Sequence, residues 1–169
     1  QDVDETINLP FVYTESGGSN QSGDFIDAPD GVVQLLHTID NETQGCLLSL
    51  GGTNAISPTK EVIFEARIKV TLHTDAVFAA ASDYLVFVGL ATAGTPVGHA
   101  TNTIDNIADS VGFQLGSDSG SLSIFLESDD DSTDNDDKDS GIDLTSGTYH
   151  TYKIDMTDIS DVKFYVDGV

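Results

Sequence analysis

The stretch EVIFEARIKVTL, residues 61–72, decides the fold class. Its apolar and polar side chains alternate with a period of two, and the one apolar residue out of phase is Ile63. Successive side chains of a β-strand point to opposite faces, so the pattern predicts a long strand with one face on a core and the other in water. The inward positions are Val62, Phe64, Ala66, Ile68, Val70 and Leu72.

The same alternation returns near the end of the sequence, in residues 149–156 (YHTYKIDM) and 162–166 (VKFYV), followed by an Asp-Gly pair typical of a turn. Residues 84–91 (YLVFVGLA) are apolar on both faces, which predicts a central, covered strand. Further strands are predicted at residues 9–14, 24–28, 32–38, 46–50, 111–115 and 122–127.

So many short strands with polar turns between them predict an all-β fold. The expected architecture is an antiparallel β-sandwich, most simply a jelly roll. We expect residues 1–8 to form a polar N-terminal arm and residues 9–169 to form a single sandwich domain.

Charge is the strongest signal in the composition. Acidic residues outnumber basic ones 29 to 6, and the formal net charge is −23. Nucleic acids and anionic membranes need clustered Lys and Arg, whereas the six basic residues are scattered along the sequence. We therefore expect no nucleic-acid partner and no membrane partner. High negative charge favours solubility and suits the surface of a particle that must not aggregate.

The ordered segments FEARIKV, YLVFVGLA, SVGFQL, SLSIFLES, YHTYKIDM and VKFYVDG resemble the concanavalin A-like, laminin-G-like jelly roll. The resemblance covers residues 62–169 and looks most like domains of tailed-phage structural proteins, such as head decoration proteins, head fibres and tail appendages. It implies partners among capsid proteins and copies of the chain itself. In laminin-G-like relatives one more strand follows the Asp-Gly turn. The resemblance therefore implies that this strand is lacking, or comes from the N-terminal segment or a neighbouring chain.

The hydrolase branch of the same family carries a Glu-x-Asp-x-x-Glu arrangement on one strand. Two carboxylates about 5 Å apart serve retaining glycosidases, and a two-residue step along a strand brings two side chains together on one face. Here the strand has only Glu61 and Glu65, with Ile63 between them. The resemblance therefore carries over no catalytic residue, and we expect no enzyme.

An acidic loop is predicted at residues 129–141. Calcium takes six to eight oxygen ligands, mostly from carboxylates and carbonyls, and the loop has many. The candidate ligands are Asp129, Asp131, Asp134 and Asp136. Their spacing does not match an EF-hand loop, and the alternative interpretation is a solvated loop whose like charges repel. Calcium is the one cofactor that the sequence suggests.

Two tyrosines are candidate ligand-binding residues, because Tyr149 and Tyr165 lie on the outward phase of the last two strands. Exposed aromatic rings can stack on a sugar or contact a neighbouring subunit. His150 is in phase with Tyr152 and Ile154, so we expect it in the core or at a strand edge.

These observations predict a non-enzymatic structural protein of a phage particle, located in the virion and forming homo-oligomers. It would decorate or stabilise a capsid, or form part of a fibre or tail appendage. The alternative is a carbohydrate-binding module or adhesin on the same fold, located outside the cell and binding glycans.

Overall fold

The computed structural model describes residues 12–17, 21–26, 32–37, 44–49, 60–71, 86–92, 109–118, 121–130 and 133–169. These residues contain eleven strands and no helix, so the described part of the chain confirms the all-β prediction. The predicted arm, residues 1–8, lies outside the described residues.

The chain divides into two compact units, and the first comprises residues 1–55 and 94–99. Its described part holds β1 (Val12–Gly17), β2 (Gln21–Ile26), β3 (Val32–His37) and β4 (Gln44–Ser49). β1 pairs with β4, and β2 pairs with β3, both antiparallel. The predicted strands at residues 24–28 and 32–38 are thus confirmed for their described part, and they pair with each other.

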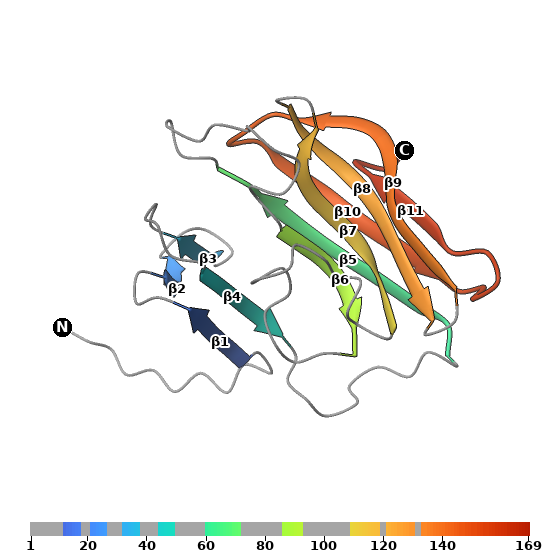
Figure 1. The fold of residues 1–169 in the computed structure, drawn as a ribbon, viewed down its shortest axis with the longest axis horizontal. Coiled ribbons are helices and arrows are strands. Elements are labelled where there is room, and N and C mark those ends of the chain that lie inside the picture. The colour runs from blue at the N-terminus through green and yellow to red at the C-terminus, as the bar shows by residue number, and fades with distance from the viewer. Residues whose placement is uncertain are drawn as a thin grey trace. The chain divides into compact units, whose positions relative to one another are not determined.

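The second unit comprises residues 56–93 and 100–169 and forms a β-sandwich. One sheet has the order β11-β10-β5 and the other has the order β6-β7-β8-β9 (Figure 1). The strands are β5 (Val62–Lys69), β6 (Val86–Ala91), β7 (Asp109–Asp118), β8 (Ser121–Asp130), β9 (Asp134–Leu144), β10 (Tyr149–Met156) and β11 (Lys163–Val166).

The two sheets share one hydrophobic core. Phe113 of β7 is fully buried, and its ring makes edge-on contacts with Tyr152 of β10 and Phe164 of β11, at centroid distances of 5.2 and 5.4 Å. Aromatic rings prefer this geometry because the electropositive edge of one ring faces the electronegative face of the other. The buried core consists of Val88, Phe113, Leu115, Leu122, Ile124, Tyr152, Ile154, Met156 and Val166.

The phase predicted for the long strand is confirmed. Phe64 and its inward neighbours on β5 are partly buried against the core, while Ile63 is 55% exposed. β5 pairs with β10 over its whole length, from Val62 opposite Met156 to Lys69 opposite Tyr149. The period of two therefore correctly identified the inward residues of both strands, and the register of the pair places these inward residues opposite each other.

The prediction of a loop at residues 129–141 is wrong for the described residues. β8 continues to Asp130, and β9 begins at Asp134 and pairs with β8 antiparallel. Backbone hydrogen bonds to a neighbouring strand need no apolar side chain, so a run of Asp can form a strand at the end of a sheet. The ladder has two register shifts, between Ile124 and Phe125 and between Leu126 and Ser128. Such irregularities are common in end strands.

The predicted Asp-Gly turn after β11 is confirmed. Asp167 and Gly168 both have positive φ, 53° and 86°. Gly adopts this conformation without strain, and Asp is among the few other residues that tolerate it. The sandwich is shown by the described residues, whereas the single domain over residues 9–169 stays a prediction.

Candidate functional site

The outer face of the three-stranded sheet collects most of the chain's basic residues. Side chains that alternate with the core positions of β5, β10 and β11 point away from the core, and we call this surface the outer face. Its members are Glu61, Ile63, Glu65, Arg67, Lys69, Tyr149, Thr151, Lys153, Asp155, Lys163 and Tyr165. Four of the six basic residues of the chain, one Arg and three Lys, are in this set. Basic residues that are scattered along the sequence therefore lie together on one face of the folded sheet.

Tyr149 lies beneath two of these cations. The guanidinium carbon of Arg67 is 4.5 Å from the ring centroid, and Nζ of Lys69 is 5.1 Å from it. β5 positions both cations beside the ring, because Lys69 is the register partner of Tyr149 and Arg67 is the next outward residue along β5. Cations are attracted to the negative face of an aromatic ring. Tyr149 remains 38% exposed, so its ring and the two charges are available to a partner.

Tyr165 forms a separate cation–aromatic pair, with Nζ of Lys153 5.2 Å from its ring centroid. Lys153 is its register partner on β10 and lies four residues beyond Tyr149. At roughly 3.3 Å per residue, the two tyrosines are about 13 Å apart along the strand direction. The sheet therefore places both on the outer face without bringing them together, and their role in ligand binding stays a prediction.

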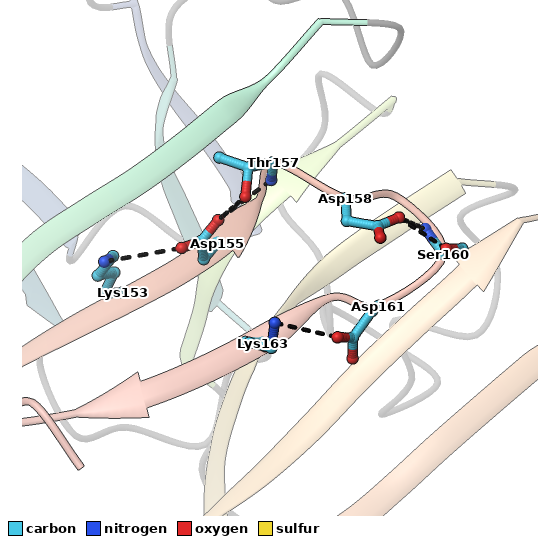
Figure 2. A network of polar contacts seen from close by, with 7 residues as sticks. All are labelled: Lys153, Asp155, Thr157, Asp158, Ser160, Asp161 and Lys163. Atoms are coloured by element: carbon cyan, nitrogen blue, oxygen red, sulfur yellow. Dashed lines mark hydrogen bonds and ion pairs between the residues drawn. The ribbon is translucent and has the colours of Figure 1, made fainter.

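The cations near the turn between β10 and β11 have carboxylate partners. Lys153 Nζ is 3.9 Å from Asp155 Oδ2, and Lys163 Nζ is 3.0 Å from Asp161 Oδ2 (Figure 2). By contrast, no described carboxylate lies within ion-pair distance of Arg67 or Lys69. The end of the outer face around Tyr149 therefore carries two positive charges that no described neighbour neutralises.

His150 links the same end of β10 to the turn after β11. Its Nδ1 is 2.7 Å from Asp167 Oδ2, and Asp167 Oδ1 accepts a hydrogen bond of 2.8 Å from the backbone N–H of Thr151. These bonds hold the pKa of Asp167 below its ordinary value, chiefly through the Thr151 N–H and then through His150. His150 is partly buried on β10, the middle strand of its sheet, in phase with the core residues Tyr152 and Ile154, so it does not lie at a sheet edge. The role of Asp167 was missed, although its place before Gly168 marked the turn.

No protein-family model, no curated protein and no solved structure matches this chain. The likeness to the concanavalin A-like family therefore remains a likeness of strand and turn patterns. In the described part of the chain, no helix is long and apolar enough to span a membrane.

The calcium candidates lie at one end of the β8–β9 pair. Asp129 on β8 is the register partner of Asp134 on β9, and Asp136 follows on β9. Asp131 lies outside the described residues. No group of three metal-ligating side chains occurs among the residues that the structure describes. The calcium site stays a prediction.

Two buried polar residues of β8 were not expected from the sequence. Ser123 is 2% exposed and its hydroxyl donates a 2.8 Å hydrogen bond to Asp143 of β9, while Glu127 is 1% exposed. Both alternate with the core residues Leu122 and Ile124, so they lie on the face of β8 that points away from the core. Their burial depends on what packs against this face of the sheet, and the sequence pattern of one strand carries no information about that packing.

A cleft of about 310 Å³ lies between the last strands of the two sheets, β9 and β11. Its apolar lining consists of Phe113, Leu126, Ile142, Phe164, Val166 and Val169. The further strand that the family resemblance implies after the Asp-Gly turn stays a prediction.

The turn between β10 and β11 provides a prediction about acid. Oδ1 of Asp155 accepts hydrogen bonds from the N–H and hydroxyl of Thr157, at 3.1 and 2.7 Å (Figure 2). Oδ1 of Asp158 accepts the same pair from Ser160, at 3.0 and 2.6 Å. Each carboxylate has its pKa lowered from 3.8, mainly by its hydroxyl partner.

A carboxyl group whose pKa is lower in the folded protein than in the unfolded chain stabilises the fold at any pH above its unfolded-state pKa. This stabilisation is lost as the pH falls through the folded-state pKa. The double variant Asp155→Asn, Asp158→Asn should therefore melt below the wild type at pH 7. The difference in melting temperature should shrink as the pH falls below about 4. Thermal melts of both proteins from pH 7 to pH 2.5 measure it. A difference that stays constant over this range would mean that these two carboxylates do not contribute through their charge.

Proposed function

We propose that this chain is a non-enzymatic structural component of a virus particle, decorating or stabilising a capsid or forming part of a fibre or tail appendage. The observation that carries the proposal is the outer face. A sheet face with cation–aromatic pairs and alternating charges suits contact with another protein, because Arg and Tyr are enriched in such interfaces. The jelly-roll pattern of residues 62–169 and the net charge of −23 also support a particle component.

The particle component is expected in the virion, with capsid proteins and copies of itself as partners. Antibody raised against this chain should label purified particles from the source of the sequence in electron micrographs. The matched control is the same antibody after absorption with the purified chain. Particles that contain their full set of capsid proteins and never carry the label would contradict the proposal.

A carbohydrate-binding module or adhesin is the second candidate, and the environment of Tyr149 favours it. A ring with Arg67 and Lys69 beside it could hold a sugar that carries a carboxylate. If this candidate is correct, the chain binds to a glycan array, measured with and without calcium. The variant Tyr149→Ala should abolish that binding. Ile63→Ala on the same face serves as the control. A blank array in both conditions would reject it.

A further inference from the structure

The outward side chains along β5 divide into two ends of opposite charge. Glu61, which directly precedes β5, and Glu65 lie toward the start of the strand, whereas Arg67 and Lys69 lie toward its end. All four side chains are exposed. The ring of Tyr149 lies beneath both cations, at 4.5 and 5.1 Å, and holds them together at one end. The outer face therefore has a negative end and a positive end.

The other cations of the outer face are already paired. Nζ of Lys153, near the middle of the face, is 3.9 Å from Asp155, and Nζ of Lys163 is 3.0 Å from Asp161. These pairs leave two negative charges at one end of the face and two positive charges at the other. The net charge of the whole chain is −23. Two copies that approach through this face can therefore avoid an excess of like charge at the contact.

We propose that the outer face binds the outer face of a second copy of this chain, with the strands of the two sheets antiparallel. The two-fold axis of this dimer lies between the two sheets and runs across their strands. It turns the face end for end, so the positive end of each copy meets the negative end of the other. A two-fold contact uses one surface twice, and the charges of this face are complementary to themselves. The inference rests on the proposed function, because it names a partner of the surface that the function uses.

The spacing of the four charges along β5 suits this arrangement. Glu61 and Lys69 are centred on position 65, and Glu65 and Arg67 are centred on position 66. One axis across the strand at these positions therefore brings Lys69 opposite Glu61 of the second copy and Arg67 opposite Glu65 of the second copy. Sheets that pack face to face lie about 10 Å apart, a distance that two long charged side chains can span.

The size of the outer face predicts a weak dimer. Ile63, which is 55% exposed on this face, would be covered in the contact. At about 3.3 Å per residue and about 4.8 Å between strands, the face measures roughly 26 Å by 14 Å. This patch is smaller than the roughly 800 Å² that each partner contributes to a standard interface, so association needs a high concentration of the chain. Particle components meet this condition, because many copies are held close together.

Sedimentation of the purified chain from about 10 µM to about 1 mM measures this association. At about 0.15 M salt the Debye length is about 8 Å, so repulsion between distant charges is screened while charges in contact still attract. The wild type should form dimers and no larger assembly, because a two-fold contact is closed. The variant Arg67→Glu, Lys69→Glu should dimerise at least about tenfold more weakly. The control Lys60→Glu, Lys138→Glu makes the same change in net charge at exposed positions off the outer face and should dimerise like the wild type.

A charge exchange between the two ends tests the antiparallel arrangement. Glu61→Lys, Glu65→Lys makes both ends of the face positive, and Arg67→Glu, Lys69→Glu makes both ends negative. Each variant alone should lose dimerisation, because like charges then meet at every contact. An equimolar mixture of the two should form a mixed dimer, because opposite charges meet at every contact. The mixed dimer also shows that both variants fold.

A wild type that stays monomeric up to about 1 mM would overturn the inference. Undiminished dimers of either variant alone, assemblies that grow beyond a dimer, or a mixture that does not associate would overturn it as well. The proposed function is tested separately by the antibody. Labelled particles together with a monomeric wild type would reject the dimer and leave the virion role, whereas unlabelled particles together with the mixed dimer would reject the virion role and leave the dimer.

Discussion

Phe113→Ala is expected to lower the free energy of unfolding by about 3–5 kcal/mol, because it empties the centre of the sandwich. The side chain is fully buried, and it touches both sheets through its contacts with Tyr152 and Phe164. Removing the ring deletes both aromatic contacts and leaves a cavity that β-sheets on two sides cannot readily close. At about 2–4 °C per kcal/mol, the melting temperature should fall by roughly 6–20 °C.

Denaturant titration of Phe113→Ala beside Ile63→Ala measures this effect. Ile63 is 55% exposed on the outer face, so its truncation should change stability by no more than about 0.5 kcal/mol. A loss below about 1 kcal/mol for Phe113→Ala would mean that the two sheets do not pack on each other through this ring.

Gly89→Ala is expected to be the second most damaging of these substitutions. Gly89 of β6 and Gly112 of β7 are register partners. A methyl group on Gly89 would meet the carbonyl oxygen of Val111 and lie 2.6 Å from Cα of Gly112, so the β6–β7 backbone would have to move apart. Overpacking of this kind costs about 1–3 kcal/mol, and more where backbone must shift.

Gly147→Ala is the matched control for Gly89→Ala. Gly147 has a φ of 81°, and a methyl group there would meet no atom within 4 Å. Its cost comes from the backbone conformation alone, about 1–2 kcal/mol. Thermal unfolding should therefore show the larger loss for Gly89→Ala. Equal losses at the two positions would contradict the close approach of β6 and β7.

The long strand and the last two strands could be predicted from sequence because their two faces differ. β10 has the predicted bounds, Tyr149–Met156, and its buried residues are the ones in phase with Tyr152. One face in the core and one in water impose a period of two, and this period is visible in a single sequence.

The parts that could not be predicted depend on pairing between distant segments. β9 was hidden because Asp residues disfavour strands, and its partner β8 provides the backbone hydrogen bonds that hold it. The basic residues seemed scattered because Arg67 and Lys153 are far apart in sequence, and only the register of β5 against β10 brings them onto one face. Burial of Glu127 likewise depends on what covers its face of the sheet.

The central claim is that the outer face is the contact surface of this chain in its assembly, and lysine acetylation footprinting tests it most directly. Isolated chain and intact particles are treated with the same reagent, and the modified lysines are identified by mass spectrometry. Lys69 and Lys153 lie on the outer face beside Tyr149 and Tyr165, whereas Lys60 precedes β5 and is exposed. The account predicts that Lys69 and Lys153 lose reactivity in the particle while Lys60 keeps it. Unchanged reactivity of Lys69 and Lys153 in the particle would contradict the claim.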